Sequence, residues 1–133
     1  MTTAVSRFYN VILCEDIRDE VGNKKSLMGV MTGDVVVGSF PVVLSVAIFM
    51  EYRPNAVDPV RVSFNFRLLQ DDVEVVKAGM VSDIPAGQSA NLIMPRALMS
   101  VEKEVIFRIL GSVDGGPEEE VLKKRIFVQS TTS

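Results

Sequence analysis

Hydrophobic residues recur with a period of two along most of this chain. The clearest example is the segment 60–68, whose alternate positions are all apolar: Val60, Val62, Phe64, Phe66 and Leu68. This alternation predicts a strand with one buried and one solvated face. The polar residues 70–72 predict a turn, and Val73 to Val81 the returning strand. The alternation slips at Val75 and Val76, which predicts a β-bulge, and Gly79 suggests a second irregularity.

A second pattern is the uncharged run from Val35 to Met50, VVVGSFPVVLSVAIFM. As a helix it would span about 24 Å, less than the roughly 30 Å of a bilayer core. Its β-branched and aromatic residues favour strand, so we expect no membrane span. Proline cannot donate to a strand ladder, so Pro41 divides the run. The expected elements are a short segment 35–37 and a long strand 42–52.

The remaining apolar segments predict further short strands at 8–14, 25–31, 91–94, 104–110 and 121–129. Between them we expect a charged connection at 15–20, a connection at 95–99 that could hold a helical turn, and a tight turn at 114–117. The tail 130–133 is expected to fray. Seven to nine strands with frequent turn signals predict a single domain, 1–133, folded as an antiparallel β-sandwich, immunoglobulin-like or C2-like. A closed β-barrel is the alternative.

The opening of the chain carries three distinctive strings, ILCEDIR at 12–18, GNK at 22–24 and SLMGV at 26–30. With these strings it resembles the opening of an uncharacterised bacterial family of small proteins. The family shows a Cys-acid-acid-aliphatic-Arg stretch, a Gly-Lys turn and a Ser-Leu-aliphatic-Gly motif, and the turn here carries an additional Asn23. The resemblance implies a small β-rich fold and no particular activity.

The apolar content raises the question of what covers the long strand. Apolar residues make up 47% of the chain, with a mean hydropathy of +0.27. A long strand with no charge before Glu51 makes a poor exposed edge, so we expect the segment 42–52 to be central or paired. The apolar excess fits either a generous core or a surface covered by a partner. The candidate interface residues are Val42, Leu44, Val46, Ile48 and Met50, together with Arg61 and Arg67 on the wet face of the neighbouring strand.

Charge and composition argue against nucleic-acid binding and enzymatic catalysis. The formal net charge is −3 and the isoelectric point about 5.0, and the basic cluster 123–125 follows the acidic cluster 118–120. We therefore expect no nucleic-acid binding. The chain has no histidine and one cysteine, Cys14, so it lacks the usual base for a nucleophile and cannot form an internal disulfide. We expect no enzyme, with a small residual chance of a hydrolase, and no cofactor.

Acidic residues leave one ligand-binding alternative open. Glu15, Asp16, Asp19 and Glu20 form the densest cluster, and Asp71, Asp72 and Asp83 could converge with them. Calcium takes six to eight oxygen ligands, but the spacing matches no EF-hand loop. These residues fit a solvated charged connection better, and Glu15, Asp16, Asp19, Asp71 and Asp72 remain weak metal candidates.

The sequence thus predicts a non-enzymatic protein–protein interaction or assembly module that forms a homo-oligomer or joins a larger assembly. A small-ligand or calcium-binding β-sandwich is the alternative. No signal peptide is visible at residues 1–13, so we expect a cytoplasmic protein, or one within a phage or bacterial assembly, that binds no membrane.

Overall fold

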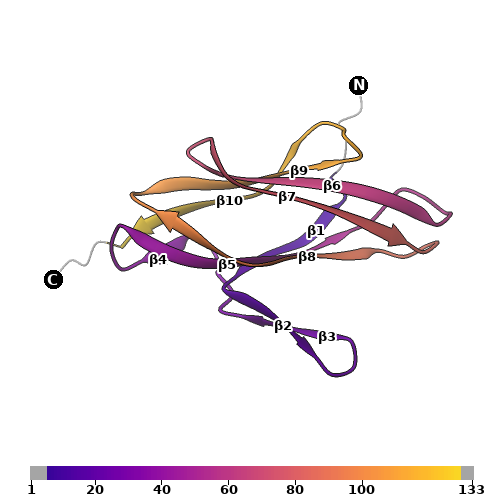
Figure 1. Cartoon of the computed structure of the whole chain (residues 1–133), viewed down its shortest axis with the longest axis horizontal. Coiled ribbons are helices and arrows are strands. Elements are labelled where there is room, and N and C mark those ends of the chain that lie inside the picture. The colour runs from indigo at the N-terminus through magenta and orange to yellow at the C-terminus, as the bar shows by residue number, and fades with distance from the viewer. Residues whose placement is uncertain (1–5, 130–133) are drawn as a thin grey trace.

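The computed structural model describes residues 6–129 and shows an all-β protein (Figure 1). Its ten strands exceed the expected seven to nine. They are β1 (Phe8–Cys14), β2 (Asp16–Glu20), β3 (Lys24–Met28), β4 (Val35–Val37), β5 (Val42–Tyr52), β6 (Val60–Gln70), β7 (Val73–Ile84), β8 (Ala90–Val101), β9 (Val105–Val113) and β10 (Glu119–Val128). The tail 130–133 lies outside the described residues.

Two sheets face each other and form the predicted β-sandwich. A three-stranded sheet has the order β1-β5-β8, and a five-stranded sheet the order β4-β10-β9-β6-β7. All pairings are antiparallel except β4 with β10. Within residues 6–129 no strand pairing joins the two sheets, so the barrel alternative is wrong. The same residues contain no helix long and apolar enough to cross a membrane.

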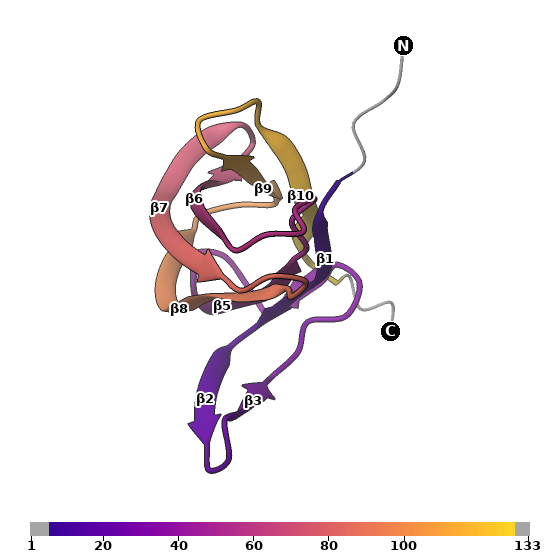
Figure 2. The same cartoon turned by 90° about the vertical axis from the view of Figure 1, so that its right-hand side faces the viewer.

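The third sheet is the hairpin β2–β3, which we call the arm. It extends away from the sandwich on the side of the three-stranded sheet (Figures 1 and 2). Residues 15–20 were expected to form a connection and instead include β2, while β3 spans 24–28 rather than 25–31. Charged strands form here because the hairpin pairs Asp19 with Lys25 and Glu20 with Lys24 across the two strands.

The uncharged run 35–50 divides as expected into the strands 35–37 and 42–52. The two strands belong to different sheets, because β4 pairs with β10 and β5 lies between β1 and β8. Pro41 immediately precedes β5, where its missing N–H removes no ladder hydrogen bond. The long apolar strand is therefore central in its sheet, and its hydrogen-bonding groups are used by neighbours on both sides.

Local irregularities match the sequence at some positions and not at others. The register of β6 and β7 shifts where Leu69 pairs with Glu74 and Leu68 with Val76, which confirms the bulge at Val75. Gly79, in contrast, pairs regularly with Asn65, so the second irregularity is wrong. The connection predicted at 95–99 is also wrong, because β8 runs continuously from 90 to 101. Pro95 fits inside it because the β5–β8 register shifts beside it.

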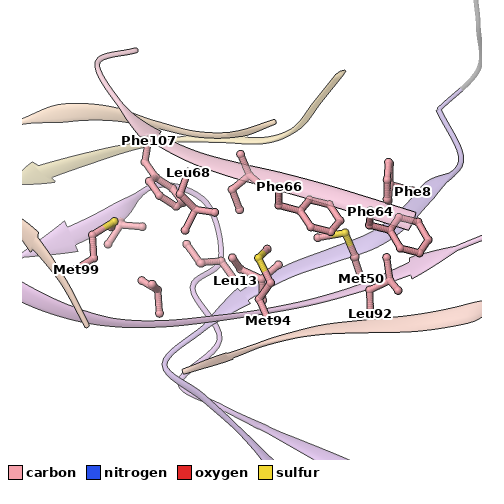
Figure 3. Close-up of a cluster of buried hydrophobic side chains, with 14 of the residues drawn as sticks. Phe8, Leu13, Met50, Phe64, Phe66, Leu68, Leu92, Met94, Met99 and Phe107 are labelled. Atoms are coloured by element: carbon pink, nitrogen blue, oxygen red, sulfur yellow. The ribbon is translucent and has the colours of Figure 1, made fainter. Parts of the chain in front are cut away.

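The core fills the space between the two sheets. Phe64, Phe66 and Phe107 from the five-stranded sheet are fully buried and face the aliphatic and methionine side chains of the other sheet (Figure 3). Gly111 pairs with Phe66, and a Cβ at position 111 would lie 2.9 Å from the Phe66 ring. The missing side chain at Gly111 therefore gives the ring its place against β9.

Candidate interaction surface

The outer face of the five-stranded sheet carries several ion pairs. Arg67 donates two hydrogen bonds to Glu118, at 2.7 and 2.8 Å, and its guanidinium lies 3.6 Å from Glu74. Arg108 lies between Asp72 and Glu120, at 2.6 and 2.8 Å. These pairs form within one chain, so the guanidinium groups already have carboxylate partners.

The hydrogen bonds between Arg67 and Glu118 shift the pKa values of both side chains. The hydrogen bonds from Arg67 lower the pKa of Glu118, and Glu118 in turn raises the pKa of Arg67. Arg61 is exposed and lies 3.9 Å from Asp83. Both arginines predicted as interface residues thus lie on a solvated, internally paired sheet face, which offers a partner few free charges.

The outer face of the three-stranded sheet carries apolar side chains on all three of its strands. Ile12, Phe49 and Ile93 occupy one row across its three strands, pointing away from the core, and each is half-buried. Val43 and Leu98 lie on the same face and are 60% and 64% exposed. We call these five residues the apolar face. Its composition contrasts with the arginine and carboxylate pairs on the outside of the other sheet.

The interface residues predicted on β5 point the wrong way. Val46, Ile48 and Met50 are at most 3% exposed and pack inside the sandwich, and Val42 and Leu44 also pack against the core. Their prediction as interface residues is corrected by this burial: the chain's own second sheet covers them. The outward positions of β5 are the odd-numbered ones, which include Val43 and Phe49. The even-numbered positions are all apolar, whereas the odd-numbered ones include Ser45 and Glu51, so the alternation itself indicated which side is buried.

Hydrogen bonds join the arm to the three-stranded sheet. The Ser45 hydroxyl donates to the Glu15 carbonyl at 2.7 Å and accepts from Arg96 Nε at 2.8 Å. Ser45 is the cross-strand partner of Leu98, so the exposed leucine lies beside the base of the arm. The Glu15 amide also donates to the Met28 carbonyl, and the Met31 amide to the Leu13 carbonyl. These hydrogen bonds fix the orientation of the arm relative to the three-stranded sheet.

The cysteine and glycine of the opening motif lie at this base. Cys14 is completely buried, and its thiol contacts the carbonyl oxygens of Asp16 and Ala47 at 3.5 Å. Burial raises the pKa of the Cys14 thiol. Gly29 has a φ of +66°, and a Cβ there would lie 2.7 Å from Cδ of Glu15. The motif residues 14, 15 and 29 thus have a structural role in shaping the root of the arm.

The arm itself presents a mixed surface. Arg18 pairs with Asp16 at 3.3 Å, Lys25 pairs with Asp19, and Ser26 donates to Glu20 at 2.9 Å. Its apolar residues include Val21 at the tip, 95% exposed, and Met28 near the base, 42% exposed. Beyond Met28, Val30 is also exposed and borders a hollow that Val36 and Leu44 help to line. Exposed apolar side chains thus occur on the arm and just beyond it as well as on the apolar face.

The acidic residues considered for calcium are distributed over separate elements. Asp16 and Asp19 pair within the arm, and the Glu15 side chain lies over Gly29. Asp71 and Asp72 form the β6–β7 turn of the opposite sheet, where Asp71 Oδ1 accepts from the Ile106 amide and Asp72 pairs with Arg108. Within residues 6–129 no group of three or more His, Cys, Asp or Glu could hold a metal ion.

Two hollows lie where the edges of the sheets part. One, of about 370 Å³, is lined by Tyr52, Arg7 and Glu118 among others, and burial raises the pKa of the Tyr52 hydroxyl. The other, of about 400 Å³, lies between β7 and β8 and is largely apolar, with Val76, Met80 and Met94 in its walls. It opens beside the free edge of β7. The sequence did not indicate either hollow, because each is made by residues far apart in the chain.

Comparison with protein-family models, curated proteins and solved structures found no match. The resemblance of residues 12–30 to a bacterial family therefore stays a prediction.

Proposed function

We propose that this protein is a non-enzymatic interaction and assembly module that associates with further copies of itself through the apolar face and the arm. The observation that carries the proposal is the contrast between the two outer sheet faces. One carries intrachain ion pairs and exposes Val81 at its β7 edge, whereas the other exposes Val43 and Leu98 beside a projecting hairpin. Val43 and Leu98 are diagonal neighbours on adjacent strands, and exposed apolar side chains that cluster on a small protein are typical of an interaction site.

The arm supports this proposal through its position. It extends beyond the sandwich (Figure 2), and its own two strands supply nearly all its hydrogen-bonding partners. A two-stranded hairpin is marginally stable by itself in water, and packing against a second protein surface would stabilise it. The exposed apolar residues Val21 at its tip and Met28 near its base would contact that second surface.

The test removes exposed apolar surface without touching the core. In the double variant Val43→Thr/Leu98→Gln both side chains become polar, and threonine retains strand propensity. We expect light scattering to show that self-association requires a protein concentration at least about tenfold higher than for the original chain, equivalent to a loss of about 1.4 kcal/mol. The control is Val57→Thr, since Val57 is 87% exposed in a loop away from the face.

Two results would count against the proposal. One is an unchanged association in the double variant, provided that its circular dichroism and melting temperature match those of the original chain. The other is an equal effect of Val57→Thr, which would indicate a general response to losing exposed valine rather than a specific surface.

A further inference from the structure

The edge strand β7 is open to pairing along a long regular stretch. β7 has 12 residues and lies at the end of the five-stranded sheet, where β6 is its sole partner within residues 6–129. The other sheet edges are interrupted: β4 has 3 residues, and β1 and β8 each pair with β5 through a shifted register. In β7 the irregularity is confined to Val75, so the segment 76–84 pairs with β6 without a break. An unpaired strand of this kind is a template for another strand.

The charges of this segment select one way for it to pair with itself. Lys77 and Asp83 are its charged residues, and both side chains are exposed; Asp83 also lies 3.9 Å from Arg61 of β6. In an antiparallel pair, directly opposite residues point to the same side, so a register can shift by steps of two. When Met80 lies opposite Met80 of a second copy, the whole segment 76–84 is paired and Lys77 lies opposite Asp83 of that copy, twice. A shift of two residues in either direction loses both charge pairs.

We infer that two copies of this chain join edge to edge through β7, antiparallel, with Met80 on the two-fold axis. The five-stranded sheets then continue into one another across the dimer. This contact is separate from the apolar face and goes beyond the function proposed above.

The side chains on both sides of β7 suit this register. On the inner side, Val76, Ala78 and Met80 are half-buried and line the apolar hollow between β7 and β8. The register places the two Met80 side chains against each other at this hollow and shields them from water. On the outer side Val81 is 55% exposed, and it comes to lie opposite Gly79, which has no side chain to oppose it. Every directly opposed pair is thus apolar, small or oppositely charged.

The first test is a cysteine placed on the predicted axis. Cys14 is buried, so an introduced cysteine would be the accessible thiol of the described chain. We expect Met80→Cys to form a disulfide-linked dimer under mild oxidation. The matched control is Ser82→Cys on the same side of β7, because its two copies would be offset by four residues, about 13 Å, beyond disulfide reach. The Met80→Cys dimer should form at least about tenfold faster, since only that pair meets the geometric requirement.

The second test exchanges the charges. Lys77→Glu and Asp83→Lys each place like charges opposite each other twice, and we expect each to weaken dimerisation about tenfold. The combined variant Lys77→Glu/Asp83→Lys restores opposite charges and should recover the original affinity to within a few-fold. Melting temperatures of the four proteins at low concentration show whether the fold itself is unchanged. The combined variant carries both substitutions, so misfolding caused by either one would lower its affinity as well. Recovered affinity therefore shows that the single variants dimerise weakly because of charge repulsion.

Other results would overturn the inference. Equal cross-linking of Met80→Cys and Ser82→Cys, or faster cross-linking of Ser82→Cys, contradicts the register. Failure of the combined variant to recover affinity contradicts the charge pairing. The outer-face variant Val43→Thr/Leu98→Gln should leave Met80→Cys cross-linking unchanged. If cross-linking fails while association still depends on Val43 and Leu98, the β7 contact is wrong and the proposed function stands.

Discussion

Gly29 combines two constraints that make it hard to replace. Its backbone lies in the left-handed region, and the Glu15 side chain occupies the space where a Cβ would be. Gly33 has a similar φ, +69°, but a Cβ there would meet nothing within 4 Å. Alanine at position 33 would add backbone strain alone, whereas alanine at position 29 would add backbone strain and a close contact with the Glu15 side chain. Comparing the two substitutions therefore isolates the effect of that contact.

We expect Gly29→Ala to lower the free energy of unfolding by more than Gly33→Ala does. The backbone term alone is about 1 kcal/mol or more at either position, because alanine disfavours this region. Urea denaturation of both variants measures the difference. Equal losses would show that Glu15 moves aside freely and that Gly29 does not fix the base of the arm.

Cys14 should behave as an inert core residue. It is completely buried, and burial raises the pKa of its thiol, so the reactive thiolate is disfavoured. We expect no reaction with a thiol reagent at mildly alkaline pH in the folded protein and stoichiometric reaction in denaturant. Prompt labelling of the folded protein would contradict the burial of this side chain.

Arg67 and Glu118 predict a defined pH dependence. The pKa of Glu118 is lowered in the folded state, so the pair contributes stability above the ordinary glutamate pKa of about 4.3, and this contribution is lost as the pH falls through the folded-state value. The melting temperature of Arg67→Gln should therefore be below that of the original chain near neutral pH, and the difference should close in acid. A difference that widens in acid would contradict the assignment.

The strands show how far the pattern of residues determines each element. The alternation in 60–68 predicted both the strand and its buried face, because one set of positions was apolar and the other polar. In 42–52 the even positions are all apolar and the odd positions include Ser45 and Glu51, so the alternation also indicated the inward side, and the predicted interface residues were nevertheless on that side. β2 was missed because its residues are charged, and its formation depends on cross-strand partners in β3. β8 was predicted too short because Pro95 interrupts the pattern, and the bulge that accommodates it depends on pairing with β5.

The candidate site was less predictable than the fold. The sequence indicated that the uncharged strand mattered for association, and the expected interface residues were on its core side. The hydrogen-bonded pair of Arg67 with Glu118 joins residues 51 positions apart in the chain, so no local pattern could have shown it.

The arm should be the least stable of the paired elements. Its strands pair with each other alone, while β5, β6 and β9 each pair with neighbours on both sides. We expect amide hydrogens of β2 and β3 to exchange faster than those of β5, β6 and β9 at low protein concentration, because local opening needs little apolar surface to be exposed. Amide exchange followed by mass spectrometry on overlapping peptides measures this. Protection of the arm equal to that of β6 in dilute protein would contradict its independence.

For the whole molecule, the two proposed contacts, the apolar face and the β7 edge, predict different effects of salt on self-association. Association through the apolar face should change little with ionic strength, whereas the Lys77–Asp83 pairs at the β7 edge should weaken as salt screens them. Dimerisation of the Val43→Thr/Leu98→Gln variant, which retains the β7 edge, should therefore fall as salt is raised. Sedimentation at low and high salt checks this. A rise in affinity with salt would mean that the remaining contact is apolar and not the β7 edge.

Self-association itself can be measured directly by sedimentation equilibrium of the unmodified chain over a wide concentration range. The chain has a mass of 14.6 kDa. A self-associating module predicts an average mass that equals the monomer in dilute solution and rises to the dimer or beyond as concentration increases. A mass that stays at the monomer value into the high micromolar range would contradict self-association through either surface.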